Sequence, residues 1–111
     1  MSFSRLLIFA LLAIVGWHLV GSLSDSTSAR DVSPDHDVVI FTAPWCGYCD
    51  QARRFLEHED VDFLEIDIES STSANNRFQE AGGRGVPLTF IGEERFSGFS
   101  ARAYGQAIDQ L

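Results

Sequence analysis

A strand, a helix and a second strand predicted between residues 38 and 68 constrain the fold of this chain more than any other feature of its sequence. Residues 38–41 form a continuous apolar run rich in branched side chains, which is typical of a strand covered on both faces. Apolar residues then recur at helical spacing over residues 46–58, and residues 64–68 alternate between apolar and acidic. Because two strands joined by a helix pair in parallel through a right-handed crossover, we expect an α/β fold.

The remaining sequence predicts a second helix, a hairpin and a last helix. Residues 74–81 repeat apolar side chains at helical spacing between a polar cap region and two glycines. Residues 88–91 and 95–96 form a predicted hairpin around Gly92, and Ser100 is the predicted N-cap of the final helix. Since hairpin strands pair antiparallel, the pattern predicts a mixed four-stranded sheet with helices on both faces, in the order βαβαββα.

An apolar helix is predicted before this domain. Residues 6–20 are almost entirely apolar, Arg5 precedes them, and a stretch rich in Ser, Thr and Asp follows. This is the layout of an export signal, and two forms of it stay open: an uncleaved membrane anchor over residues 6–23, or a signal peptide that is removed. The chain then divides into three parts: a targeting segment, residues 1–23; a flexible linker, residues 24–36; and one folded domain, residues 37–111.

Charge indicates where the domain works. Arg5 lies before the apolar run, whereas the chain as a whole has a formal net charge of -8 at pH 7. Because cytoplasmic flanks of membrane segments are enriched in Lys and Arg, we expect a single-pass inner-membrane protein whose domain faces the periplasm, or a secreted periplasmic protein after cleavage. Because a chain with this negative charge repels the phosphate backbone of DNA or RNA, no nucleic acid is expected as a partner.

Cys46 and Cys49 lie three residues apart at the predicted start of a helix, and the chain has two cysteines in all. Such a pair binds a metal, forms a structural disulfide or cycles between dithiol and disulfide. A zinc site needs four ligands, and His36 and His58 lack the partner spacing of such sites, so no metal is expected. A disulfide across so short a loop constrains the unfolded chain little. The redox interpretation is therefore favoured.

The helix start also assigns a role to each cysteine. Backbone N–H groups and the positive end of the helix dipole favour a thiolate on Cys46, which we predict to be the nucleophile. Cys49 lies one turn further in and is predicted to resolve the mixed disulfide. Trp45 and Tyr48 flank the thiols with aromatic surface that suits a peptide or glutathione.

Three segments, in this order, resemble the thioredoxin superfamily and, within it, the glutaredoxins and glutaredoxin-like redoxins: residues 41–49 (FTAPWCGYC), 84–87 (RGVP) and 97–100 (SGFS). The resemblance implies a thioredoxin-like fold and a thiol-disulfide oxidoreductase. It also implies that Pro87 is cis and faces the cysteines, and that Val86 offers its backbone to the substrate.

The same resemblance assigns substrate contacts to the end of the hairpin. Gly98, Phe99 and Ser100 are expected to border the substrate, with an ordinary turn glycine and helix cap as the alternative. Arg84 is expected to attract a substrate carboxylate or to stabilise the Cys46 thiolate, unless it is a solvated loop residue.

Departures from these families guide the choice of substrate. The chain lacks the Lys and the Gly-Gly-Asp pattern with which glutaredoxins hold glutathione, so protein disulfides are the expected substrates and glutathione is the second choice. The expected reductant is a thiol or a membrane electron donor, and the expected state is a monomer with no cofactor other than its redox-active disulfide. The competing interpretation is a binding module for metal delivery or membrane-complex assembly, but neither Met nor His accompanies the cysteine pair.

Overall fold

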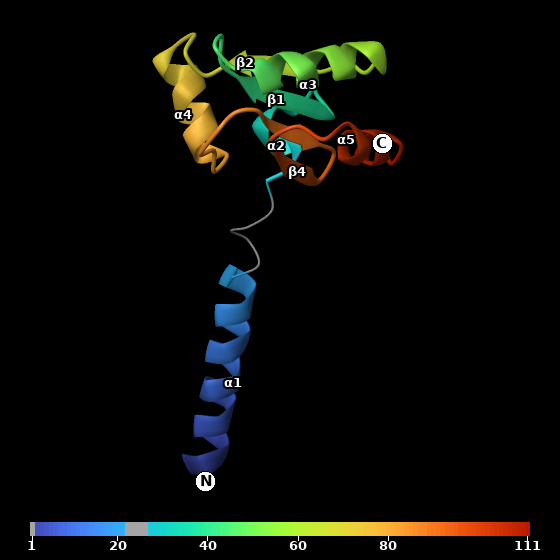
Figure 1. The fold of residues 1–111 in the computed structure, drawn as a ribbon. Coiled ribbons are helices and arrows are strands. Elements are labelled where there is room, and N and C mark those ends of the chain that lie inside the picture. Colours follow the sequence, from blue (N-terminus) through green and yellow to red (C-terminus); the bar gives the residue numbers. More distant parts are fainter. Residues whose placement is uncertain (1, 22–26) are drawn as a thin grey trace.

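The computed structural model describes the backbone of residues 2–21 and 27–111, and the side chains of residues 3–13 and 27–111. Helix α1 (Ser2–Gly21) precedes the folded domain (Figure 1). None of the described helices combines the length and the apolarity that crossing a membrane requires. Part of the predicted anchor, residues 22–23, and part of the predicted linker, residues 24–26, lie outside the described residues.

Four strands form one sheet in the order β2-β1-β3-β4. Their bounds are β1 (Val38–Thr42), β2 (Leu64–Asp67), β3 (Leu88–Ile91) and β4 (Glu94–Ser97). Strand β1 pairs parallel with β2 and antiparallel with β3, and β3 pairs antiparallel with β4. Every residue of the two central strands is buried, as the continuous apolar runs predicted. The predicted mixed sheet is confirmed.

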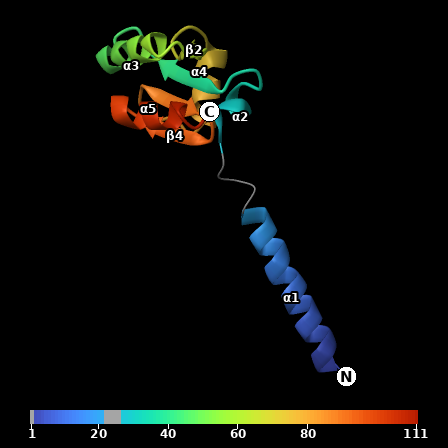
Figure 2. The ribbon, with the colours of Figure 1, turned by 90° about the vertical axis from the view of Figure 1, so that its right-hand side faces the viewer.

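Helices cover both faces of the sheet. Figure 2 shows α3 (Gly47–His58) and α5 (Ala101–Ile108) on one side, and α4 (Thr72–Glu80) with the short α2 (Ala29–Val32) on the other. Successive residues of β1 belong to two different apolar clusters, one under each pair of helices, because side chains alternate across a pleated strand. The thioredoxin-like βαβαββα order predicted from the sequence is therefore present.

The segment predicted as a flexible linker, residues 24–36, differs from that prediction in its described part. Helix α2 (Ala29–Val32) forms there, capped by Ser28. The Ala29 side chain is fully buried and its N–H donates to the carbonyl of Gly92 at 2.9 Å. Gly92 follows β3, which runs antiparallel to β1, so α2 docks at the end of the sheet where β1 begins.

A network of charged side chains ties α3 to the sheet. The Arg53 guanidinium donates to both carboxylate oxygens of Glu65 in β2, at 2.5 and 2.7 Å, and to Asp50 at 2.7 Å. The buried hydroxyl of Thr42, at the end of β1, donates to Glu65 at 3.0 Å. These hydrogen bonds, led by those from Arg53, lower the pKa of Glu65 below its ordinary value of 4.5.

Replacing Arg53 by Gln is expected to lower the free energy of unfolding by about 1–3 kcal/mol, because a half-buried carboxylate loses its charge-assisted partners. Urea unfolding measures this loss. The loss should shrink as the pH falls below 4.5, since a carboxylate with a lowered pKa stabilises the fold only while it is ionised.

The matched control is Arg54→Gln, which removes the same charge from the next residue of α3, where the side chain is exposed. This variant should change stability by less than about 0.5 kcal/mol. Equal losses in the two variants, or a loss in Arg53→Gln that is the same at every pH, would show that the network does not hold α3.

Candidate redox site

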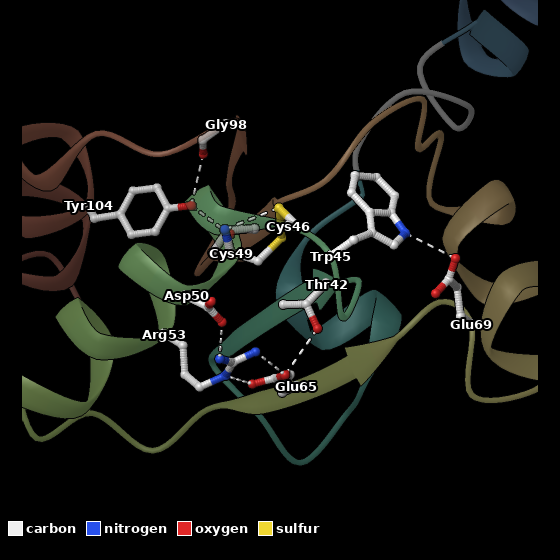
Figure 3. Close-up of a disulfide and its surroundings, with 11 residues drawn as sticks. Thr42, Trp45, Cys46, Cys49, Asp50, Arg53, Glu65, Glu69, Gly98 and Tyr104 are labelled. Atoms are coloured by element: carbon white, nitrogen blue, oxygen red, sulfur yellow. Dashed lines mark hydrogen bonds and ion pairs between the residues drawn. A yellow bond between two sulfur atoms is a disulfide. The ribbon is translucent and has the colours of Figure 1, made fainter.

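The cysteine pair lies where β1 ends and α3 begins (Figure 3). Cys46 is the N-cap of α3 and Cys49 is in its first turn, so the helix begins one residue later than predicted. The two side chains form a disulfide, with their Cα atoms 5.2 Å apart. The Cys49 N–H donates to Sγ of Cys46 at 3.1 Å, and such a bond favours a thiolate on Cys46 once the disulfide is reduced.

The two sulfur-bearing side chains differ in access. Cys49 is 0% exposed and Cys46 is 6% exposed, and both pack against Ala43 with Ile68 and Val86 beside them. An attacking sulfur must be reached by the substrate, whereas a resolving sulfur needs to reach only its partner. This difference favours Cys46 as the attacking sulfur, and the two roles stay predictions.

A second segment faces the pair. The Val86–Pro87 peptide bond is cis, as the resemblance implied, and Val86 packs against the cluster that holds both cysteines. The Gly98 N–H donates to the carbonyl of Pro87 at 2.9 Å. Gly98 has a φ of 89°, a conformation that residues with a side chain rarely adopt, so the backbone at this position requires glycine.

Tyr104 holds this second segment in place, a role that the sequence analysis missed. Its hydroxyl donates to the carbonyl of Gly98 at 2.9 Å (Figure 3). The same hydroxyl lies 2.7 Å from the Thr89 hydroxyl. Burial raises the pKa of Tyr104, so the hydroxyl keeps its proton. The sequence did contain a signal for this role. Tyr104 lies among apolar residues that share one face of the final helix, and a buried tyrosine hydroxyl needs a hydrogen-bond partner.

Phe99 and Ser100 make contacts within the domain. The Phe99 ring packs 5.8 Å from Phe55 and 5.2 Å from Tyr104, measured between centroids. The Ser100 hydroxyl accepts the N–H of Ala103 at 3.3 Å and caps α5, as predicted. The Ser100 contact matches the helix-cap alternative, and contact of both residues with substrate stays a prediction.

The aromatic side chains next to the cysteines are exposed, Trp45 by 70% and Tyr48 by 66%. The Trp45 indole N–H donates to the carboxylate of Glu69 at 3.0 Å. Glu69 lies between β2 and α4, so this hydrogen bond connects the Trp45 ring to a second segment of the chain. The ring projects beside the disulfide (Figure 3). Sequence reasoning missed Glu69, because its partner is 24 residues away in the chain.

A groove of about 650 Å³ joins most of the remaining predicted residues. Arg84, Val86 and Pro87 line it together with Gly98, and Arg95 from β4 adds a second cation that the sequence analysis did not single out. Within residues 3–13 and 27–111, no cluster of three or more His, Cys, Asp or Glu side chains is arranged to hold a metal ion.

These features define a class of protein. A cysteine pair at a helix N-terminus, opposite a cis-proline in a βαβαββα fold, is the arrangement of a thioredoxin-fold redox protein. Residues 38–96 match the family profile described as Glutaredoxin. A glutaredoxin of Pseudomonas aeruginosa is 37% identical over 62 residues, which cover 55% of this chain and 74% of that protein. The chain therefore belongs to the glutaredoxin family.

Solved structures agree with this assignment. A glutaredoxin from Archaeoglobus fulgidus superposes with a TM-score of 0.62 at 20% identity, over 69% of this chain and 90% of that one, which shows the shared fold. NrdH-redoxin from Escherichia coli, described as a glutaredoxin-like protein with a thioredoxin-like activity profile, superposes with a TM-score of 0.55 at 25% identity, over 62% of this chain and 91% of that one.

Replacing Tyr104 by Phe is expected to cost about 1–3 kcal/mol of folding free energy, because the Gly98 carbonyl and the Thr89 hydroxyl lose a buried partner. Urea unfolding measures the loss. Tyr48→Phe is the matched control, since it removes the same hydroxyl from an exposed ring and should leave stability within about 0.5 kcal/mol. The proposed role of Tyr104 fails if both variants are as stable as the wild type.

Proposed function

We propose that this protein is a thiol-disulfide oxidoreductase that reduces or exchanges disulfides in protein substrates through Cys46 and Cys49. The observation that carries the proposal is the asymmetry of the pair. Cys46 is the N-cap of α3, receives a backbone hydrogen bond and is the more exposed sulfur, whereas Cys49 is fully buried behind it. This asymmetry supports attack by Cys46 and resolution by Cys49.

In the reducing direction the exchange takes two steps. The Cys46 thiolate attacks one sulfur of the substrate disulfide, the substrate S–S bond breaks, and the departing sulfur takes a proton. Cys49 then gives up its proton and attacks Sγ of Cys46, which releases the second substrate sulfur as a thiol. Two electrons and two protons pass to the substrate, and the Cys46–Cys49 disulfide remains until a thiol reductant or a membrane electron donor reduces it.

A protein substrate suits the surroundings of the pair better than glutathione alone. Trp45 and Tyr48 offer exposed aromatic surface on one flank, and the groove of about 650 Å³ offers polar surface on another. The chain contains no lysine, so it lacks the cation that glutaredoxins use to hold glutathione. The fold similarity to NrdH-redoxin, with its thioredoxin-like activity profile, supports the same choice.

Single substitutions test the assignment of roles. Cys46→Ser should abolish the reduction of a peptide disulfide, because the attacking thiolate is lost. Cys49→Ser should still attack but should accumulate a mixed disulfide between Cys46 and the peptide, detected by intact-protein mass spectrometry. The double substitution is the control for background exchange.

Mixed disulfides on Cys49 in the Cys46→Ser variant would reverse the assigned roles. A reduced pair that never forms the internal disulfide, but binds one metal ion tightly per chain, would instead support the binding-module alternative.

We also propose that residues 1–23 direct the domain to the periplasmic side of the inner membrane. The apolar side chains of the first residues support this, because seven large ones between Phe3 and Leu12 are more than half exposed and need an apolar environment: Phe3, Leu6, Leu7, Ile8, Phe9, Leu11 and Leu12. We further propose that the protein is a monomer, because one chain supplies both cysteines of the exchange.

Cell fractionation tests this location. The full chain should be recovered with the inner membrane or in the periplasm, and a chain that begins at residue 24 should stay in the cytoplasm, because it lacks the export signal. Recovery of both chains from the same compartment would contradict the proposal.

A further inference from the structure

The groove beside the redox pair has the opposite charge to the chain as a whole. Two arginines, Arg84 and Arg95, line it, and none of the residues that line it is acidic. The chain has 16 Asp and Glu against 8 Lys and Arg, for a formal net charge of -8. Since clefts focus the field of the charges that line them, this groove attracts anions on an otherwise acidic protein.

Arg95 is anchored by uncharged backbone groups, which leave its positive charge uncompensated. Its two terminal nitrogens donate to the carbonyls of Ala81, at 3.1 Å, and Gly82, at 2.7 Å, at the end of α4. The guanidinium also lies 5.9 Å from the centroid of the Phe90 ring. Because both acceptors are uncharged and arginine has five N–H donors, donors and positive charge remain for a ligand.

Neither groove arginine is neutralised within the described part of the chain. The ion pairs found there join Arg30 to Asp37, and Arg53 to Asp50 and Glu65. Those arginines serve the fold. Arg84, by contrast, is an exposed residue next to the segment that faces the cysteines.

The groove is continuous with the site of exchange. Val86, Pro87 and Gly98 line it, and Val86 belongs to the cluster around Cys46 and Cys49. A peptide attached to Cys46 through a mixed disulfide therefore places residues that flank its cysteine in the groove. The opposite side is different, because Figure 3 shows Glu69 and Trp45 across the disulfide from Gly98.

We propose that Arg84 and Arg95 select protein substrates that carry an Asp or Glu side chain on one side of the reacting cysteine. This inference rests on the proposed oxidoreductase function and adds the substrate class. The arginine fork binds a carboxylate through paired hydrogen bonds, and the Glu69 carboxylate repels an acidic side chain on the other flank. Recognition is therefore directional.

Steady-state reduction of defined peptide disulfides by the full chain tests the proposal, with dithiothreitol supplied to reduce the Cys46–Cys49 disulfide after each turnover. The rate with dithiothreitol alone is subtracted. Each peptide has one cysteine in mixed disulfide with 2-mercaptoethanol, and three Glu or three Gln residues stand before or after that cysteine. Three residues are used because Arg95 lies level with Phe90 and Val39 in the sheet, further from Cys46 than one residue reaches. For one of the two positions, kcat/KM should be about 3- to 10-fold higher with Glu than with Gln. This preference should fall at 1 M salt, where charges are screened over a few ångströms.

Arg84→Glu should reverse the preference while the contacts of Arg95 with α4 remain in place. Arg102→Gln removes an exposed arginine of α5 that does not line the groove, and should leave the preference unchanged. Arg95→Gln should weaken the preference, and its urea unfolding curve shows whether α4 stays attached.

The outcomes separate the two proposals. Turnover of all peptides with equal kcat/KM for Glu and Gln would overturn the groove proposal alone, as would a preference that survives Arg84→Glu. Glutathione carries carboxylates too, so a neutral peptide in mixed disulfide with glutathione is a further substrate. A dependence on Arg84 for this substrate alone would also overturn the choice of an acidic peptide. No turnover of any disulfide would overturn the proposed function itself.

Discussion

The position of β1 at the centre of the sheet is the constraint on which the site depends. The strand is hydrogen-bonded on both edges and buried on both faces, so its end has no freedom to shift. The turn that follows is closed by the Cys46 N–H, which donates to the Ala43 carbonyl at 3.2 Å. Cys46 is thereby placed at the N-cap of α3, and the ion pair between Arg53 and Glu65 fixes that helix to the neighbouring strand.

The two flanks of the site are each held by a residue from a distant part of the chain. Tyr104 of α5 holds the Gly98 carbonyl, and Gly98 in turn donates to Pro87. Glu69 holds the indole of Trp45 on the other flank. The cysteine motif itself is short and local, but the surface around it is assembled from three separate segments, so changes far from the cysteines alter what approaches them.

This division explains what the sequence could predict. Central strands buried on both faces leave continuous apolar runs, and a helix that starts at a cysteine pair is a local signal, so β1, α3 and both cysteines were predictable. Helix α2 has only four residues, and it depends on the burial of Ala29 and a bond to Gly92 across the fold. Arg95 was missed for the same reason, because its acceptors lie up to 14 residues away.

Arg95 also shows how one side chain serves both the fold and recognition. A lysine at this position would offer a single point charge, and satisfying the carbonyls at the end of α4 would use most of its donors. The planar guanidinium instead donates from both of its terminal nitrogens to Ala81 and Gly82 while its charge stays uncompensated beside the groove. The contact that closes α4 therefore fixes a cation at a defined place in the groove, so one residue both anchors the end of α4 and contributes to the proposed selectivity for an acidic partner.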